Sequence, residues 1–200
     1  MDGVLVDFEA GAVELIAAIL DGTADPVWTE GSKSIMKSIE RVKVDLGDGW
    51  RPSTGHDLGA KGVRQLMMSA ISSSPGKFFE GLSALDDGMD ELWPFLHELG
   101  PPVHMLSAPV RGRKGSGPTA GDGKMSWVHS RLRPQPASII IADARHKQNW
   151  AIADGVPNLL VDDKLSTIES WRARGGIGIL HVPGESSGSI NRLKACLGCL

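Results

Sequence analysis

Three apolar runs in the second half of the chain limit the fold more than any other feature. They read ASIIIAD at 137–143, NLLVDD at 158–163 and GIGILHV at 176–182. Each run is apolar at nearly every position, which is typical of strands buried on both faces of a parallel sheet. Between the last two lies LSTIESWRARG at 165–175, a helical pattern that ends at a glycine, as many helices do. We therefore expect an α/β fold in which parallel strands alternate with helices.

The same alternation extends toward the N-terminus. PVHMLSA at 102–108 predicts a further strand, and KMSWVHSRL at 124–132 predicts a helix that follows a Gly-rich, basic loop. DGMDELWPFLHEL at 87–99 predicts another helix, which Pro94 interrupts or kinks. FEAGAVELIAAIL at 8–20 has the apolar spacing of a helix close to the start of the chain.

Residues 22–75 differ in composition from the rest. Gly, Ser and charged residues are frequent there, and the apolar spacing is helical only in short pieces such as SIMKSIERV and VRQLMMSAI. This pattern predicts a helical subdomain inserted into the α/β core, and 200 residues suit one core with a small cap. We expect a Rossmann-like parallel-sheet core formed by 1–17 and 79–200, and a helical cap over 18–78.

The charge and hydropathy of the chain argue against two classes of partner. The formal net charge is −3 and there is no long basic run, so nucleic acid is not an expected partner. The sequence has no apolar stretch of about 18 residues that could span a membrane, and no secretory signal pattern at its start. We therefore expect a cytoplasmic protein, either a monomer or a homodimer.

Two cysteines, Cys196 and Cys199, lie in ACLGCL at the C-terminus. A C-x-x-C pair can be redox-active or can form half of a zinc site. Neither a second pair nor a βα context follows this one, so we expect two free thiols on a C-terminal tail.

Polar side chains stand where predicted strands end, and ligands bind beyond the carboxyl ends of strands in doubly wound sheets. Ser107 ends one strand, Asp162 and Asp163 end another, and the turn at Asp2 would follow a strand if one came before it. Lys124 opens the helix after the Gly-rich loop. Carboxylates bind Mg²⁺, and lysine and hydroxyl groups neutralise phosphoryl oxygens, so the combination suits phosphoryl transfer. Taken singly, the aspartates could cap a helix, the serine could form a turn and the lysine could be solvated.

Four segments resemble the motifs of the haloacid dehalogenase (HAD) superfamily in their usual order. MDGVLVDF at 1–8 resembles the first motif, D-x-D-G-V-L-x-D-F. Ser107 in HMLSAP resembles the second motif, Lys124 in GKMSWV the third, and Asp162-Asp163 in LLVDDK the fourth. The resemblance covers nearly the whole chain.

Within the superfamily the chain is most similar to the 5′(3′)-deoxyribonucleotidases. Those proteins carry a P-G-F-F-x-x-L segment, a K-x-x-W-V motif and an L-I-D-D-R motif. This chain has SPGKFFEGLSAL at 74–85, KMSWV at 124–128 and LLVDDKLSTIESW at 159–171.

The resemblance implies an Mg²⁺-dependent phosphatase with an HAD-type, Rossmann-like core. It implies catalytic roles for Asp2, Ser107 and Lys124, magnesium ligands at Asp2, Asp162 and Asp163, and substrate contacts at Phe78, Phe79 and Ala108. In such enzymes one Asp attacks phosphorus to form an aspartyl-phosphate. A second Asp, matching Asp2, protonates the leaving oxygen and then activates water. Phe78 and Phe79 would border a cap pocket for the base, or they pack the cap against the core.

The chain departs from the family pattern at its first residue. The attacking Asp would stand two positions before Asp2, so it and its strand lie outside this sequence. Two expectations compete. One is a start upstream of Met1, which we favour because Met is common at the middle position of the motif. The other is a truncated protein with lost or altered catalysis.

The expected substrate is a small phosphate monoester, with a nucleoside monophosphate as the leading candidate. One alternative is a catalytically inactive protein that binds phosphate or nucleotide, and another is a phosphatase for sugar or lipid phosphates. Arg111, Arg113 and Lys114 in the Gly-rich loop either help to bind phosphate or are solvated loop charges.

Overall fold

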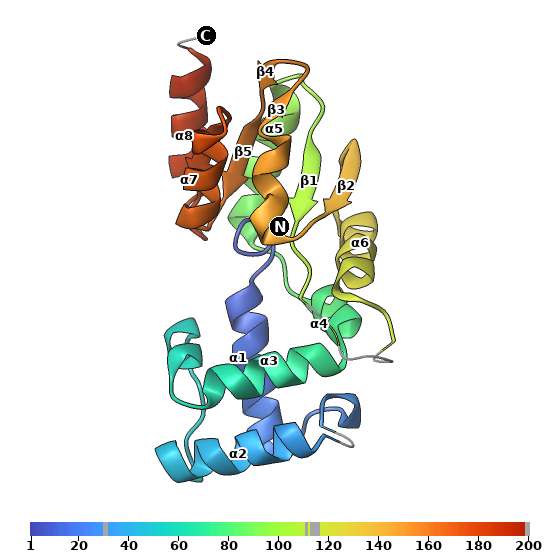
Figure 1. Ribbon diagram of the computed structural model, residues 1–200, viewed down its shortest axis with the longest axis vertical. Helices are drawn as coiled ribbons and strands as arrows, with labels where there is room; N and C mark the ends of the chain where they lie inside the picture. Colours follow the sequence, from blue (N-terminus) through green and yellow to red (C-terminus); the bar gives the residue numbers. More distant parts are fainter. Residues whose placement is uncertain (30–31, 111, 113–116, 199–200) are drawn as a thin grey trace. The chain divides into compact units, whose positions relative to one another are not determined.

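The computed structural model of the chain describes residues 1–29, 32–110, 112 and 117–198, and it shows a mixed α/β protein (Figure 1). The chain divides into two compact units. The strand unit comprises Met1–Asp7, Ser83–Pro109 and Val128–Leu200. The helical unit comprises Phe8–Leu82 and Val110–Trp127.

Described strands of the strand unit form three two-stranded ladders, two of them parallel. The strands are β1 (His104–Ser107), β2 (Ser138–Ile141), β3 (Ile152–Ala153), β4 (Val156–Pro157), β5 (Leu159–Asp162) and β6 (Ile177–Leu180). β1 pairs with β2 in parallel, with His104 opposite Ser138, and β5 pairs with β6 in parallel, with Leu159 opposite Ile177. β3 and β4 form a short antiparallel hairpin.

Each apolar run that predicts a strand contains one of β1, β2, β5 and β6, so the expected parallel pairing is present. We expected a single sheet, but the described strands form separate pairs rather than one continuous sheet. The pairs share a core nevertheless: Leu160, Ile168 and Trp171 form a buried cluster against which Leu106 of β1 packs. Apolar contact therefore joins β1 to the β5 region although no backbone ladder links them.

Three of the helices around these strands lie where the sequence predicts a helix, with one local change, and two lie where no helix was predicted. They are α5 (Trp93–Glu98), η4 (Ala144–Trp150), α7 (Leu165–Ala173), α8 (Ser186–Leu197) and the end of α6 (Ala120–Arg131). The predicted helix with Pro94 starts as a π-helix at Gly88–Leu92 and continues as α5, with Pro94 in the first turn of α5. Proline lacks the N–H that an α-helical ladder needs, so a change of helix type at this place accommodates it.

The C-terminal segment is a helix rather than the expected tail. Cys196 lies on α8 as a partly buried free thiol, and Cys199 lies outside the described residues.

The helical unit is larger than the expected cap over 18–78. Its elements are α1 (Phe8–Asp21), η1 (Pro26–Trp28), α2 (Lys33–Leu46), η2 (Gly55–Gly59), α3 (Val63–Ser73), α4 (Pro75–Gly81) and the start of α6. The Phe8 ring at the start of α1 lies 5.5 Å from that of Phe78 and 6.2 Å from that of Phe79. Gly76 N donates to Pro118 O over 3.1 Å. These contacts bring α1 and residues 110–127 into the unit. Among the residues that the structure describes, no helix is both long and apolar enough to cross a membrane.

Candidate functional site

Residues 1–6 form a closed turn that holds Asp2. The carbonyl of Met1 accepts hydrogen bonds from the amides of Val4, Leu5 and Val6, over 3.1, 2.9 and 3.2 Å. Gly3 has a φ of +66°, and a Cβ atom at this position would collide with the carboxylate of Asp163. The turn therefore lies directly against Asp163, and it can do so only because position 3 has no side chain.

Asp162 ends β5 and is buried. Its Oδ2 accepts a hydrogen bond from Lys147 Nζ over 2.8 Å, and its Oδ1 accepts one from the backbone N–H of Lys164 over 2.9 Å. The side chains of Lys147 and Asp162 are 10% and 8% exposed, so this is a buried, hydrogen-bonded ion pair. The pair fixes the orientation of the Asp162 carboxylate.

Sequence reasoning missed Lys147. It lies in η4, in the segment ARHKQNW, which follows the end of β2 after Ala142 and Asp143. The signal that could have found it is its place after a strand end, where ligand-binding residues of α/β folds gather. No spacing motif distinguishes it from a solvated lysine, so its burial against Asp162 had to come from the structure.

The pKa of the Asp163 carboxyl is raised above its ordinary value. Partial desolvation raises its pKa first, and the negative charges of Asp162 and Asp2 raise the pKa further. The amino group of Met1 acts in the opposite direction and lowers the pKa. Three carboxylates thus lie within electrostatic reach of one another, and like charges so placed favour a bound cation or a bound proton.

The donor set at this place suits a magnesium ion. Among the residues that the structure describes, no group of three or more His, Cys, Asp or Glu side chains lies close enough to form a complete protein cage for a metal. Magnesium does not need one, because it keeps several waters and binds through one or two carboxylates together with substrate phosphate. Asp163 and Asp2 can supply those carboxylates, with Asp162 held beside them by Lys147.

Ser107 is the last residue of β1 and is buried, and Ala108 follows it. The carbonyl of Ser107 accepts a hydrogen bond from Ala142 N over 2.9 Å, which fixes the end of the strand against β2. Asp2, Ser107, Ala108, Asp162 and Asp163 therefore all belong to the strand unit. Gly3 lies against Asp163, so the Asp2 turn lies at the carboxyl end of β5.

Lys124, Phe78 and Phe79 belong to the helical unit. Lys124 lies on α6 and is buried, with its Nζ 4.3 Å from the centroid of the Phe79 ring. Phe78 and Phe79 lie on α4, 5% and 0% exposed, with their ring centroids 5.2 Å apart in an edge-to-face arrangement. The Phe78 ring also meets Trp28 edge-on at 6.4 Å. Within this unit the two phenylalanines are packing residues, and the Phe79 ring stabilises the lysine charge.

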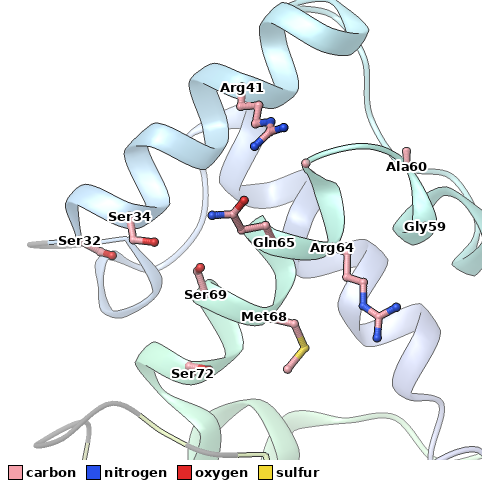
Figure 2. A pocket seen from close by; sticks show the side chains of 11 residues that line it. Ser32, Ser34, Arg41, Gly59, Ala60, Arg64, Gln65, Met68, Ser69 and Ser72 are labelled. Carbon is pink, nitrogen blue, oxygen red and sulfur yellow. The ribbon is translucent and has the colours of Figure 1, made fainter.

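A hollow of about 770 Å³ lies between α2 and α3 of the helical unit. Figure 2 shows Arg41 of α2 and Gln65 of α3 pointing into the space between these helices, with the hydroxyls of Ser34 and Ser69 beside it. Arg41 Nε lies 3.6 Å from Asp45 Oδ2. No residue of the predicted site lines this hollow. The predicted loop charges Arg111, Arg113 and Lys114 lie outside the described residues.

No protein-family model matches the sequence, and no curated protein matches it. Among solved structures, the chain is similar to a hydrolase from Streptococcus pneumoniae TIGR4. The two chains are 13% identical, the similarity covers 99% of this chain and 95% of the other, and the TM-score is 0.50. At this identity the similarity concerns the fold alone. The chain therefore shares its fold, over nearly its whole length, with that hydrolase.

Proposed function

We propose that this chain is an Mg²⁺-dependent phosphatase with a Rossmann-like, HAD-type core, and that it acts on a small phosphate monoester. One observation carries the proposal: Asp2 and Asp163 lie together beside the buried Asp162–Lys147 pair, at the carboxyl end of a parallel strand. The hydrolase that shares the fold supports the reaction class, and the motif resemblance supports a nucleoside monophosphate as the substrate.

The proposed roles follow from charge and position. Bound Mg²⁺ would neutralise phosphoryl oxygens. Asp163 and Asp2 would hold the metal, and Lys147 would orient the Asp162 carboxylate beside them. The Ser107 hydroxyl would donate to a phosphoryl oxygen, and the motif resemblance assigns Lys124 the role of neutralising phosphoryl charge. Asp2 would also donate a proton to the leaving oxygen and later accept a proton from the attacking water. Phe78, Phe79 and Ala108 would contact the rest of the substrate.

The residue that attacks phosphorus in the resembling family has no counterpart among residues 1–200. The chain's own residues can bind, orient and neutralise the substrate, but charge stabilisation does not replace an attacking group. We therefore expect the 200-residue chain to bind Mg²⁺ and phosphate weakly and to show no turnover through an aspartyl-phosphate.

The test compares the 200-residue chain with a chain extended before Met1 by an apolar segment that ends in Asp. Both are assayed against nucleoside monophosphates and a small aryl phosphate, with Mg²⁺ and with EDTA. We expect metal-dependent turnover from the extended chain alone, and its loss when the added Asp is replaced by Asn. Robust turnover by the 200-residue chain would show that the attacking group is assigned wrongly.

If neither chain turns over any substrate but both bind phosphate in the presence of Mg²⁺, the protein is a phosphate- or nucleotide-binding protein. Isothermal titration with Mg²⁺ and inorganic phosphate measures this directly. Asp163→Asn serves as the site variant, and Asp45→Asn, on α2 of the helical unit, serves as the matched control.

A further inference from the structure

The hollow between α2 and α3 has no part in the proposed phosphatase activity. Its volume is about 770 Å³, and pockets that bind small molecules span about 300–1,000 Å³. Its lining residues fall between positions 32 and 72, all within the helical unit. This unit alone therefore forms a space large enough for a small organic molecule.

Both helices present polar side chains to the hollow at helical spacing. On α2, Ser34 and Arg41 are seven positions apart, close to two turns, so they lie on one face. On α3, Gln65, Ser69 and Ser72 follow one another at intervals of four and three positions, which again is one face. Figure 2 shows Arg41 and Gln65 pointing into the space between the helices. Each helix therefore contributes a polar face to the same hollow.

The charge around the hollow is positive. Of the described residues that line it, two are arginines, Arg41 and Arg64, and none is acidic. Asp45 lies 3.6 Å from Arg41 Nε through one oxygen and 3.8 Å from Lys61 Nζ through the other, so one carboxylate is shared by two cations. Within the described part of the chain, the two Nη atoms of Arg41 form no hydrogen bond. They can therefore bind an anion without losing a hydrogen bond within the protein.

The side chain of Arg41 is held along its apolar stem. A Cβ atom at Gly62, the residue before α3, would lie 3.5 Å from Arg41 Cγ and 3.6 Å from Val42 Cγ2. The stem therefore packs against the turn that leads into α3, and the buried Val42 anchors this part of α2 beneath it. A side chain that is already positioned loses less conformational entropy when its charged end binds a ligand.

Ser38 shows that the polar face of α2 lowers the stability of the helix contact. It lies on α2 between Ser34 and Arg41 and is 2% exposed. Its hydroxyl has no hydrogen-bond partner among the described residues. A buried hydroxyl without a partner is destabilising, and alanine at this position would avoid that cost. Local departures from optimal packing of this kind are typical of functional sites.

We propose that the hollow between α2 and α3 is a second binding site, which takes a small organic oxyanion that also carries hydroxyl groups. The oxyanion is a carboxylate or a phosphate ester, because the planar guanidinium of Arg41 binds either one through two parallel hydrogen bonds. Gln65, Ser34 and Ser69 exchange hydrogen bonds with the hydroxyl groups of the ligand. The inference does not depend on the proposed phosphatase activity, since none of the described residues of that site lines the hollow.

Isothermal titration of the 200-residue chain in EDTA tests the proposal with four probes. Gluconate combines hydroxyl groups with a carboxylate, and glucose 6-phosphate combines them with a phosphate. Glucose has the hydroxyl groups alone, and inorganic phosphate has the anion alone. EDTA removes Mg²⁺, so metal-dependent binding at the candidate phosphatase site does not contribute.

We expect gluconate or glucose 6-phosphate to bind roughly 10-fold more tightly than glucose and inorganic phosphate do. The tighter of the two identifies the oxyanion as a carboxylate or a phosphate. If neither binds more tightly than both glucose and inorganic phosphate, the proposal is wrong.

Variants of the lining residues test the contacts. Arg41→Gln should weaken binding of the tighter probe by roughly 10-fold or more, because it removes the charged fork. Gln65→Glu should weaken it as well, since it places a negative charge in the hollow on a side chain of the same shape. Lys43→Gln is the matched control, because Lys43 lies on α2, is solvent-exposed and does not line the hollow. Equal losses for Arg41→Gln and Lys43→Gln would show that overall charge causes the binding, which would overturn the proposal.

Backbone amide shifts in NMR spectra locate the bound probe. Shifts along α2 and α3, at Arg41 and Ser69 among others, support the proposal. Shifts confined to Gly3, Ser107 and Asp163 would place the probe at the candidate phosphatase site, which would overturn this proposal and leave the proposed phosphatase function standing. If Arg41→Gln does not fold, Gln65→Glu and the amide shifts of the parent chain decide the test.

Discussion

Lys147 Nζ lies 2.8 Å from Asp162 Oδ2, and both side chains are about nine-tenths buried. The lysine comes from η4 and the aspartate from the end of β5, so the pair joins two elements of the strand unit that are 15 residues apart in sequence. It is the best-defined electrostatic contact of the candidate site, and its loss should be measurable in stability as well as in function.

We expect Lys147→Met to lower the free energy of unfolding by roughly 3–5 kcal/mol, because it leaves a buried carboxylate without its partner. Asp162→Leu combined with Lys147→Met should cost less than the sum of the two single changes. Lys77→Met is the control, since the Lys77–Asp25 pair, at 2.6 Å, is solvent-exposed and should contribute little to stability. Urea denaturation measures each value. Similar losses for Lys147→Met and Lys77→Met would contradict the prediction.

Asp163 should make the protein less stable as the pH rises. Because the folded state raises the pKa of its carboxyl, the folded protein holds this proton more tightly than the unfolded chain does. The free energy of unfolding therefore falls from the ordinary aspartate pKa up to the raised native pKa. Asp163→Asn should remove this fall and be more stable than the parent at neutral pH in EDTA, with the difference vanishing in acid.

Asp122→Asn is the control, because the effect of Asp122 on stability should depend on pH in the opposite direction. Hydrogen bonds from the Thr119 amide and hydroxyl lower the pKa of Asp122, so its contribution to stability is present above the ordinary aspartate pKa and is lost as the pH falls. Urea unfolding midpoints of the parent and of both Asn variants, measured at several pH values, test the two predictions. The prediction for Asp163 is wrong if Asp163→Asn has the same unfolding midpoint as the parent at every pH.

Gly3→Ala should destabilise the protein more than Gly22→Ala does. Both glycines have a left-handed φ, +66° and +72°, which costs roughly 1–2 kcal/mol for alanine. A Cβ at Gly22 meets nothing within 4 Å, whereas a Cβ at Gly3 meets the Asp163 carboxylate. We expect an additional loss of about 1 kcal/mol or more at Gly3 from that collision. In an Asp163→Ala background, the additional loss of stability caused by Gly3→Ala should disappear. If that additional loss is unchanged, a contact other than the one with Asp163 causes it.

The Phe78 and Phe79 side chains offer a test of substrate contact against packing. We expect Phe79→Leu to lower stability by roughly 1 kcal/mol, because the replacement leaves part of a fully buried site unfilled. If the resemblance holds, it also weakens binding of a nucleoside monophosphate more than binding of inorganic phosphate. Isothermal titration measures both ligands on the folded variant. Equal changes for the two ligands would assign the ring to packing alone.

Sequence reasoning predicted the local elements well because apolar periodicity reflects burial directly. The runs containing β1, β2, β5 and β6 are apolar at nearly every position, and the structure pairs them in parallel as expected. The boundary between the two units differs from the expectation because it depends on tertiary contacts, such as those of Phe8 with Phe78 and Phe79. No local pattern encodes which of two units a helix will join.

The candidate site was only partly predictable for the same reason. Asp162 and Asp163 stand out in sequence because they end an apolar strand, and Asp2 stands out because it precedes a glycine in a turn. Lys147 has no such mark, and its contact with Asp162 joins two positions that are 15 residues apart in sequence. A side chain that matters through one distant partner can be found only when that partner's position is known.

The contact between α4 and the first turn of α6 has a consequence for how this chain can diverge. A Cβ atom at Gly123 would collide with the backbone carbonyl of Gly76, and one at Gly76 would collide with Pro118. Backbone meets backbone there, so α4 restricts the position of Lys124, the residue that follows Gly123. Any side chain at either glycine should therefore displace the lysine. In a set of homologues, the two glycines should stay invariant even where the residues around them change.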